Sequence, residues 1–466
     1  MITSVNPATG KDITQYSLQS AAEVDATLSA AVAAQRRWMA EPVGTRTALL
    51  TRIAAALRAN QDRFARLITE EMGKPLTESE GEVEKCAVTC EFYAANASRI
   101  LEDEVVPTSA SESMIVYDPL GVVLAIMPWN YPFWQVIRFL APALAAGNGA
   151  VLKHANNVPG CALALAEVML EAGAPEGLLG VVLVDNAEVA AIIADDRIAA
   201  VTLTGSTQVG SIVAGQAGRA LKPQVLELGG SDPFIVLADA DIEAAAKTAV
   251  KARFSNTGQS CISAKRFIVV EQVAEAFAEA FRRHMAELVV GDPMDRKTTV
   301  GAMARANLRD TLHAQVEASV AAGAKLVAGG KPVAGPGFFY EPTLLDGVSP
   351  EMVVFCEETF GPVAVIIRAK DTDDAIRLAN QTEFGLGAAL WTADIAAAKR
   401  LVHRIEAGAV FVNALVASDP RIPFGGIKKS GYGRELGALG MREFMNAKTV
   451  WIGTGAPVTA PQKPLD

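Results

Sequence analysis

The feature that most constrains this chain is a series of short apolar runs between residues 121 and 205. The runs are GVVLAIMP (121–128), GAVLKH (149–154), GVVLV (180–184) and AAVTLTG (199–205). Stretches of helical composition separate them, such as GCALALAEVMLEAGAP (160–175). Continuous apolar strands that alternate with helices are typical of a parallel sheet buried on both faces. The pattern therefore predicts an α/β fold.

The same alternation resumes after Gly230 and predicts a second α/β unit. Its expected strands are DPFIVL (232–237), KRFIVV (265–270), KLVAGG (325–330), VAVIIRA (363–369) and GAVFVN (408–413). Helices are expected up to Phe254, over 273–288 and over 373–380. Two units of this kind fit a chain of 466 residues, half of them hydrophobic.

Other local signals predict elements outside the two units. Ser20 and Glu23 form a capping-box pattern before a helix over 20–38, and a second helix is expected from about 44 to Gly73, just before Pro75. The segment SMIVYDPL (113–120) alternates like an exposed strand that could pair with another subunit. The proline-rich tail after Gly455 is expected to be loose.

Charge and cysteine content exclude several classes of function. The net charge of −10 without a basic run argues against a nucleic-acid partner and favours a small soluble ligand. The apolar stretch 121–152 is interrupted by prolines and by Arg138, so we expect no membrane span and no membrane partner. The five cysteines show neither CxxC pairs nor metal-ligand spacing, so we expect no metal site. No signal peptide is recognisable, so we expect a cytoplasmic location.

Four short segments carry candidate chemistry. GSTQVG (205–210), between a strand and a helix, offers backbone N–H groups to a pyrophosphate, although its GxxxxG spacing also suits an ordinary turn. Cys261 ends the polar loop NTGQSC, a setting for a nucleophile, whereas the other four cysteines are interpreted as inert packing. Glu227 stands at the end of an apolar run. If it is buried there, its pKa is raised and it can act as a base; the alternative is an exposed glutamate at the end of a strand. Asn130 in MPWNYP suits an oxyanion hole or simply satisfies its turn.

Together these segments resemble the aldehyde dehydrogenase superfamily. The matching segments are MPWNYP, LKHAN, TGSTQVG, LELGGSDP, NTGQSC, EETFGP and PFGGIKKSGYGRE, spread over nearly the whole chain. The chain looks most like the bacterial succinate-semialdehyde dehydrogenases. The resemblance implies a nucleophilic Cys261, a general base at Glu227, and an oxyanion hole formed by Asn130 and the backbone N–H of Cys261. It also implies a small aldehyde as substrate, NAD or NADP as cofactor, and a cysteine-bound thiohemiacetal and thioester as intermediates.

The resemblance also implies a cofactor site and a substrate site. The cofactor residues would be Trp129, Lys153, Asn156, Gly205, Ser206, Gly210, Leu228, Glu358 and Phe360. Because Asn156 is neutral where NAD-preferring relatives have Glu, use of both cofactors is expected. Arg138 would bind the distal carboxylate of a semialdehyde, and Ser255 replaces the second arginine of that family. Ser418 or Arg421 would complete this clamp, and the apolar walls would be Tyr131, Trp134 and Phe424.

The implied fold is a Rossmann-like cofactor domain, a second catalytic α/β domain and a small β oligomerisation element. The expected ranges are 1–100 and 120–229 for the cofactor domain, 230–430 for the catalytic domain, 101–119 and 431–455 for the oligomerisation element, and 456–466 for the tail. A homodimer or homotetramer is expected. Ser263 stands where redox-regulated relatives have a second cysteine, so no local disulfide switch is expected.

Several alternatives remain open from the sequence. The substrate could be another semialdehyde or an uncharged aldehyde. A cofactor-independent thiol hydrolase would need a histidine beside Cys261, and none of His154, His284, His313 and His403 lies in a comparable motif. A CoA-acylating dehydrogenase or a binding protein without chemistry is disfavoured by the presence of Asn130, Glu227 and Cys261.

Overall fold

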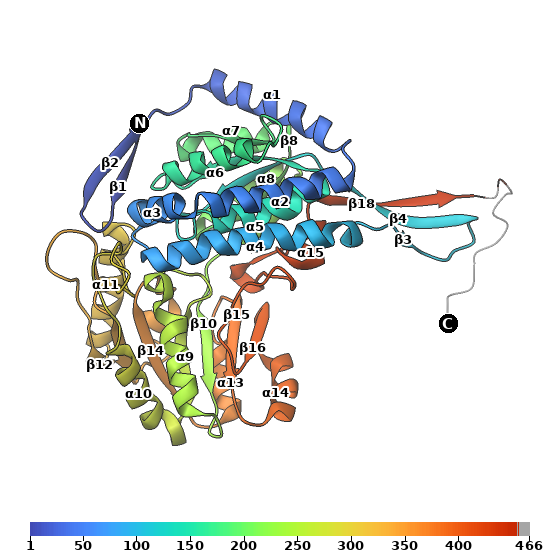
Figure 1. The fold of residues 1–466 in the computed structure, drawn as a ribbon. Helices are drawn as coiled ribbons and strands as arrows, with labels where there is room; N and C mark the ends of the chain where they lie inside the picture. Colours follow the sequence, from blue (N-terminus) through green and yellow to red (C-terminus); the bar gives the residue numbers. More distant parts are fainter. Residues whose placement is uncertain (454, 456–466) are drawn as a thin grey trace.

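The computed structural model describes residues 1–453 and 455. Its first sheet has six strands in the order β17-β9-β8-β5-β6-β7 (Figure 1). All neighbours are parallel except β17, which runs antiparallel to β9. The strands are β5 (Val122–Met127), β6 (Gly149–His154), β7 (Leu179–Val181), β8 (Ile198–Thr204), β9 (Gln224–Glu227) and β17 (Gly431–Tyr432). The apolar runs at 121–128, 149–154 and 199–205 contain β5, β6 and most of β8, and the run at 180–184 overlaps β7 only at residues 180 and 181. The predicted parallel sheet is confirmed.

The second sheet has seven strands in the order β12-β13-β14-β11-β10-β15-β16. Only β12 is antiparallel to its neighbour. The strands are β10 (Asp232–Val236), β11 (Ala264–Val270), β12 (Lys325–Ala328), β13 (Thr343–Asp346), β14 (Val363–Ala369), β15 (Gly387–Trp391) and β16 (Ala409–Val412). The predicted second α/β unit is therefore confirmed, although β13 and β15 were not predicted.

Helices flank both sheets (Figure 1). Those of the first unit are α1 (Ala21–Trp38), α2 (Val43–Ala59), α3 (Gln61–Met72), α4 (Leu76–Ile100), α5 (Trp134–Ala146), α6 (Pro159–Glu171), α7 (Val189–Ala194) and α8 (Thr207–Arg219). Those of the second unit are α9 (Ile242–Phe254), α10 (Glu271–Met285), α11 (Ala306–Ala321), α12 (Val353–Cys356), α13 (Thr372–Asn380) and α14 (Ile395–Leu401). The remaining helix is α15 (Gly437–Arg442), and short 3₁₀ turns are η1 (Asn186–Glu188), η2 (Ser255–Gly258), η3 (Val402–Arg404) and η4 (Lys428–Ser430).

The N-terminal helices follow the sequence signals in part. The capping box of Ser20 and Glu23 is present at the start of α1. The single helix expected from about 44 to Gly73 is wrong, because the chain breaks at Asn60, which leaves helical geometry and separates α2 from α3. Gly73 ends α3 in a left-handed conformation with φ of 81°, as the sequence indicated.

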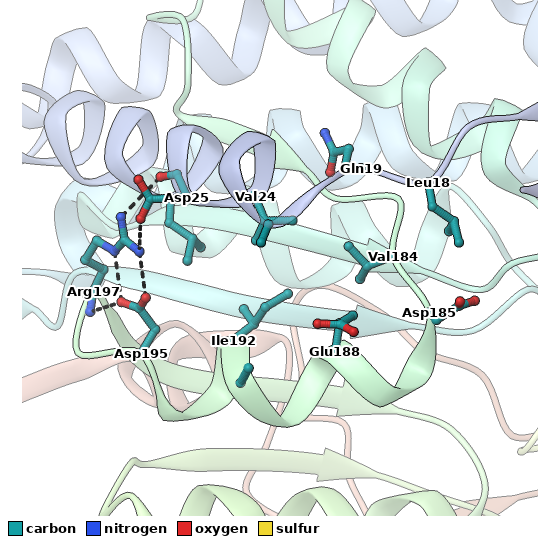
Figure 2. Close-up of a pocket in the computed structure, with 13 residues that line it drawn as sticks. Leu18, Gln19, Val24, Asp25, Val184, Asp185, Glu188, Ile192, Asp195 and Arg197 are labelled. Carbon is teal, nitrogen blue, oxygen red and sulfur yellow. Dashed lines mark hydrogen bonds and ion pairs between the residues drawn. The ribbon is translucent and has the colours of Figure 1, made fainter.

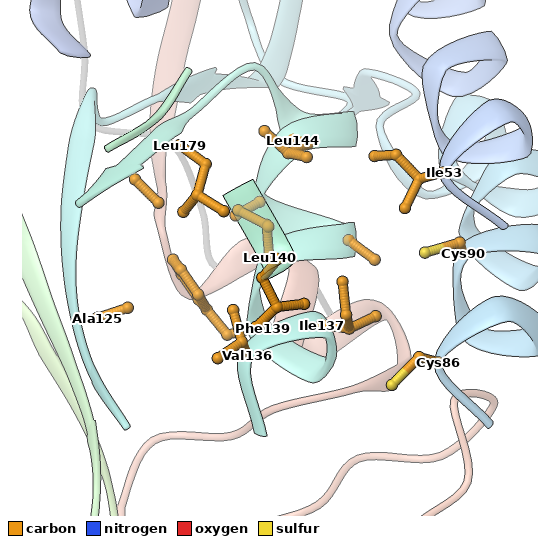
Figure 3. Close-up of a cluster of buried hydrophobic side chains, with 14 of the residues drawn as sticks. Ile53, Cys86, Cys90, Ala125, Val136, Ile137, Phe139, Leu140, Leu144 and Leu179 are labelled. Carbon is orange, nitrogen blue, oxygen red and sulfur yellow. The ribbon is translucent and has the colours of Figure 1, made fainter. Parts of the chain in front are cut away.

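The core of the first unit surrounds α5, whose residues are all buried. Figure 3 shows one face of α5 directed at Ile53, Cys86 and Cys90 of α2 and α4, and another at the sheet. Cys161 is buried as well, which confirms three of the four cysteines interpreted as packing. The interpretation of Cys356 was wrong: this residue is exposed at the end of the one-turn helix α12, and its Sγ donates to the carbonyl of Pro350 at 3.0 Å.

A three-stranded sheet projects from the body of the molecule (Figure 1). Its order is β18 (Met445–Ile452), β4 (Glu112–Pro119) and β3 (Glu104–Val105). The strand predicted at SMIVYDPL is present as β4, but it is the central strand rather than an open edge, because β18 and β3 of the same chain pair with it. The last sheet is a hairpin of β1 (Ile2–Asn6) and β2 (Lys11–Tyr16).

Three further expectations concern residues 121–152, 431–455 and 456–466. Residues 121–152 form β5, α5 and β6, and no helix in the described residues is long and apolar enough to cross a bilayer. The segment 431–455, which was assigned to oligomerisation, also supplies β17 to the first sheet. The predicted loose tail, 456–466, lies outside the described residues.

Candidate active site

A cavity of about 230 Å³ is lined by part of the predicted catalytic and cofactor set, but not by Glu227, Lys153, Asn156 or Gly210. Eight of them line it: Trp129, Asn130, Gly205, Ser206, Leu228, Cys261, Glu358 and Phe360. They come from the ends of β5, β8 and β9 in the first sheet and from loops of the second unit. Ligands of open α/β sheets commonly bind at such carboxyl ends of parallel strands.

The loop before Cys261 is held in an unusual backbone conformation. Asn256, Thr257 and Gly258 all have positive φ, at 53°, 56° and 71°. A side chain at Gly258 would place its Cβ 2.3 Å from the carbonyl oxygen of Gly361, so only glycine fits there. Consecutive left-handed residues are strained and occur where surrounding structure enforces them, often at functional sites. The strained turn presents Cys261, which is partly exposed, to the cavity.

Asn130 lines the cavity beside Cys261 and is held in place by hydrogen bonds. Its side chain is 4% exposed, and its Nδ2 donates to the carbonyl of Gln259 at 3.0 Å. Its own carbonyl accepts a hydrogen bond from Asn256 Nδ2 at 2.8 Å. An amide nitrogen carries two hydrogens, so one remains for a substrate oxygen beside Cys261.

Glu227 is a buried carboxylate with the environment that the sequence indicated. It is 2% exposed, and neither side-chain oxygen has a hydrogen-bond partner among the described residues. Burial raises its pKa, the charge of Arg138 opposes this rise, and Glu435 adds to it. Arg138 in turn forms an ion pair with Glu435. A carboxyl with a raised pKa and free oxygens is suited to proton transfer near neutral pH.

The Cys261 thiol is held protonated by its surroundings. Burial raises its pKa to about 12, whereas the nearby charges of Arg138 and Lys265 lower it. Lys265 is fully buried; its Nζ donates to the carbonyl of Cys261 at 2.8 Å and pairs with Glu358 Oε1 at 3.3 Å. The thiolate therefore needs a base or an additional positive charge in the cavity before it can react.

The start of α8 fits a pyrophosphate. Ser206 is its N-cap, with Oγ accepting from the N–H of Val209 at 3.3 Å. The helix itself cannot satisfy the N–H groups of its first turn, and these carry the positive end of the helix dipole. Gly205 differs from the prediction in one respect, because its N–H is already bonded to the carbonyl of Glu227 at 3.0 Å.

Gly210 does not offer the phosphate contact implied for it. Its N–H donates to the carbonyl of Ser206 at 2.8 Å as part of α8. A Cβ at this position would lie 2.4 Å from the side chain of Leu228. The glycine therefore allows α8 to pack closely against Leu228, which in turn lines the cavity.

Lys153 and Asn156 lie together at the end of β6. Lys153 Nζ donates to Asn156 Oδ1 at 2.8 Å and to Asn186 Oδ1 at 2.9 Å. Burial lowers the pKa of this lysine to about 8. Its partners are neutral amides, so its charge is available to a ribose or a ribose phosphate. Asn186 was not predicted, because it belongs to a separate 3₁₀ turn, η1.

Aromatic side chains form one wall of the cavity. Trp129 and Phe360 meet edge to face, with ring centroids 5.7 Å apart. The guanidinium of Arg305 lies 5.8 Å from the Trp129 ring and also lines the cavity. Arg305 was missed because it precedes α11 without any recognisable motif. A flat apolar wall beside cationic groups suits a nicotinamide nucleotide.

The predicted carboxylate clamp is arranged differently from the expectation. Arg138 is 2% exposed, pairs with Glu435 and donates from Nη2 to Thr204 Oγ1 at 3.2 Å. This placement leaves Arg138 no free charge for a substrate. Ser255 is half-buried and donates to the carbonyl of Lys251 at 2.9 Å, and Arg421 is an exposed partner of Asp419.

The remaining predicted substrate residues do not line the cavity. Ser418 Oγ accepts from Lys85 Nζ at 2.6 Å, and Lys85 lies 4.1 Å from the centre of the Trp134 ring. Phe424 is buried under the guanidinium of Arg138, at 4.8 Å. Tyr131 packs beside Cys261 on the core around α5.

The four histidines lie away from the cavity. His154 is buried, with Nε2 2.8 Å from the carbonyl of Pro132, and burial lowers its pKa to about 4. His284 contacts Glu243, His313 contacts Tyr340, and His403 is exposed near α14. None of them lines the cavity, so the histidine that a thiol hydrolase would need is not beside Cys261.

A larger cavity, of about 440 Å³, lies between α1 and α7 and contains none of the predicted residues. Figure 2 shows its polar end, where Arg197 pairs with Asp25 and Asp195. The charge of Arg197 is thus neutralised by two carboxylates that line the same cavity. In the part of the chain that the structure describes, no group of three or more His, Cys, Asp or Glu side chains is arranged to hold a metal ion.

Comparisons with known proteins agree with this geometry. The aldehyde dehydrogenase family profile matches residues 1–450. The NAD(P)+ succinate semialdehyde dehydrogenase Sad of Escherichia coli is 49% identical over 448 residues, covering 96% of this chain and 97% of the relative. A probable NADP+ succinate-semialdehyde dehydrogenase of Synechocystis is 50% identical, covering 97% and 99%. The Streptococcus pyogenes succinic semialdehyde dehydrogenase, solved with NADP+, superposes with a TM-score of 0.95 at 35% identity, covering 97% and 100%. The chain therefore belongs to the aldehyde dehydrogenase family.

Proposed function

We propose that this protein oxidises succinate semialdehyde to succinate with NAD+ or NADP+. The observation that carries the proposal is the convergence of Asn130 and Cys261 in one cavity with the free N-terminus of α8. The substrate follows from relatives at 49% and 50% identity that are named for it. Another semialdehyde or an uncharged aldehyde is the alternative substrate.

The residues of this chain suit a two-stage reaction. The Cys261 sulfur attacks the aldehyde carbon, and the thiol proton leaves toward Glu227, whose raised pKa allows it to accept. The aldehyde oxygen becomes an oxyanion that Asn130 Nδ2 and the backbone N–H of Cys261 stabilise. When bound, the nicotinamide ring supplies the acceptor for the hydride of that carbon.

The second stage releases the acid. With the hydride gone, the carbon is held as a thioester on the Cys261 sulfur. Once Glu227 has released the thiol proton to solvent, its carboxylate takes a proton from water. The resulting hydroxide attacks the thioester carbon, and the C–S bond breaks with its electron pair on the Cys261 sulfur. The carboxylic acid leaves and Cys261 is free again. Because neither oxygen of Glu227 is bonded in the structure, the carboxylate can serve both stages.

The cofactor is proposed to contact three parts of the site. The first turn of α8 would bind the pyrophosphate, and Lys153 and Asn156 would bind the adenosine ribose. Trp129, Leu228, Glu358 and Phe360 would surround the nicotinamide riboside, since they line the cavity beside Cys261. Lys153 has no carboxylate partner in the described residues, which suits the phosphate of NADP as well as the hydroxyl of NAD.

The projecting sheet supports a homo-oligomer. Val105, Trp451 and Ile452 of β3 and β18 are exposed apolar residues on it. Sheets with unpaired edges and exposed apolar residues are common subunit interfaces. We propose a homodimer or homotetramer in the cytoplasm, where free thiols such as Cys86, Cys90 and Cys161 stay reduced.

The assay that tests this function uses the purified protein, succinate semialdehyde and NAD+ or NADP+ without coenzyme A. Formation of reduced cofactor, followed by its near-ultraviolet absorbance, is expected for the wild type and not for Cys261→Ala. Hydrolysis of an ester without cofactor would instead indicate a thiol hydrolase. Turnover that requires coenzyme A would indicate an acylating dehydrogenase.

A further inference from the structure

A lysine that the sequence did not single out lies among the predicted substrate residues. Lys85, on α4, is half-buried. Its Nζ donates to Ser418 Oγ at 2.6 Å and lies 4.1 Å from the centre of the Trp134 ring. An ammonium carries three hydrogens, so donors remain after the contact with Ser418.

The other cations around this position already have carboxylate partners. Arg138 pairs with Glu435, Arg421 with Asp419, and Lys74 with Glu82. At position 255, where related enzymes have an arginine, the half-buried serine has no charge and is bonded to the backbone of α9. The substrate carboxylate therefore needs a different cation.

Lys85 is the cation of this cluster that lacks an ion pair. No carboxylate oxygen of the described residues lies within 4.0 Å of its Nζ. Burial is the main cause that lowers its pKa, to about 8, and the charge of Arg138 lowers it further, while Cys86, Glu82 and Asp419 act in the opposite direction. A desolvated ammonium without a counter-ion is stabilised by an arriving anion.

Rigid contacts connect Lys85 to the reacting end of the site. Glu82, one turn before Lys85 on α4, accepts from the N–H groups of Phe133 and Trp134 at 2.9 Å each. These residues come three and four positions after Asn130, at the start of α5. Helix α4 therefore holds the segment that follows the proposed oxyanion donor, and Lys85 lies on the same helix against the ring of Trp134. The ammonium of Lys85 and the segment that carries the amide of Asn130 are therefore linked through α4.

We propose that Lys85, assisted by Ser418, binds the distal carboxylate of the semialdehyde substrate. The inference rests on the proposed function and names the residue that selects a charged aldehyde over an uncharged one. It moves this role from Arg138, whose charge is used by Glu435, to a lysine whose charge is free.

The test compares succinate semialdehyde with butanal, which has the same chain length and no carboxylate. Lys85→Met keeps the length and apolar stem of the side chain and removes the charge. It should lower kcat/KM for succinate semialdehyde by about 10- to 100-fold, roughly 1.4–2.8 kcal/mol, mainly through KM. The kcat/KM for butanal should change less than threefold. Lys85→Arg should retain most of the preference for the charged substrate.

Lys399→Met is the matched control, because Lys399 is exposed on α14, away from the cavity. It should leave both substrates unaffected. Inhibition by succinate supplies a second readout: its inhibition constant should rise in Lys85→Met in proportion to the KM for the semialdehyde. A general folding defect would instead lower the rate on both aldehydes together. In that case Lys85→Arg, which keeps the charge, decides whether the charge is needed for the preference for the charged aldehyde.

The outcomes separate this inference from the proposed function. If the wild type does not prefer succinate semialdehyde over butanal, the proposed substrate is wrong. If the wild type shows the preference and Lys85→Met retains it, the substrate stands and the role of Lys85 is refuted. A preference lost in Lys85→Met and kept in Lys85→Arg supports both.

Discussion

Arg138 and Glu435 form an ion pair whose side chains are only 2% and 3% exposed, next to the carboxylate of Glu227. The pair connects α5 to the segment after β17, and the backbones of Phe424 and Glu435 bond to each other in both directions. This relationship accounts for a charged residue within an apolar run and places the charge of Arg138 beside Glu227, the proposed general base.

Removing one partner of this pair should destabilise the protein. Arg138→Leu leaves Glu435 buried and unpaired, and breaking a buried pair in this way typically costs about 3–5 kcal/mol. The denaturant midpoint should fall, and kcat/KM for succinate semialdehyde and butanal should fall together. The double variant Arg138→Leu/Glu435→Leu should recover much of the lost stability. A selective loss of succinate semialdehyde activity at unchanged stability would show that Arg138 is the substrate clamp after all.

Asn130→Ala should slow the chemistry without preventing cofactor binding. Loss of one oxyanion donor typically lowers turnover by about 10²–10³-fold. The dissociation constant for NAD(P)+, measured by tryptophan fluorescence, should stay within a few-fold of the wild type. Asn307→Ala, at an exposed position on α11, is the control. An unchanged turnover number in Asn130→Ala would remove this residue from the oxyanion hole.

Asn156→Glu should shift the cofactor preference toward NAD. A carboxylate at this position, beside Lys153 Nζ, would repel the ribose phosphate of NADP and neutralise the lysine. We expect kcat/KM for NADP+ to fall at least tenfold, about 1.4 kcal/mol, with a smaller effect on NAD+. Asn156→Gln should change neither strongly. A wild-type preference for NAD+ above about a thousandfold, roughly 4 kcal/mol, would show that another residue discriminates.

The preference for a charged aldehyde should depend on pH. Burial lowers the pKa of Lys85 to about 8, so the ammonium is present below this pH and is lost above it. The ratio of kcat/KM for succinate semialdehyde to that for butanal should therefore fall as the pH rises through about 8. Because Glu227 and Cys261 act on both substrates, their titration cancels in this ratio. The ratio should be flat in Lys85→Met, and its decline should move to higher pH in Lys85→Arg.

Much of the fold and the catalytic set could be predicted from the sequence, because they depend on local patterns. Buried parallel strands such as β5 and β8 are continuous apolar runs, and the segments around Asn130 and Cys261 are recognisable motifs. By contrast, α4, the longest helix described, mixes charged and apolar residues with a low periodicity and was not predicted. The break at Asn60 was missed because neither glycine nor proline marks it.

The substrate site was less predictable because its contacts join distant parts of the chain. An arginine within an apolar run indicated a partner, but nothing in the sequence identified Glu435 as that partner. Lys85 lies in a charged stretch, VEKCA, that resembles a solvated helix face, and only the fold places it against Trp134 and Ser418. Gly210 matched a phosphate motif, whereas its role is to pack against Leu228.

The most direct test of the account is to trap the covalent intermediate on Cys261. In the Glu227→Gln variant, mixed with succinate semialdehyde and NAD(P)+ and then quenched, the base is absent and the positive charge of the bound nicotinamide is left to favour the thiolate. Reduced cofactor should therefore form slowly, up to one equivalent, and the thioester should hydrolyse more slowly still. Mass spectrometry of the digested protein should find a succinyl thioester on Cys261 and on no other cysteine. Formation of reduced cofactor without an acyl group on Cys261 would contradict the proposed mechanism.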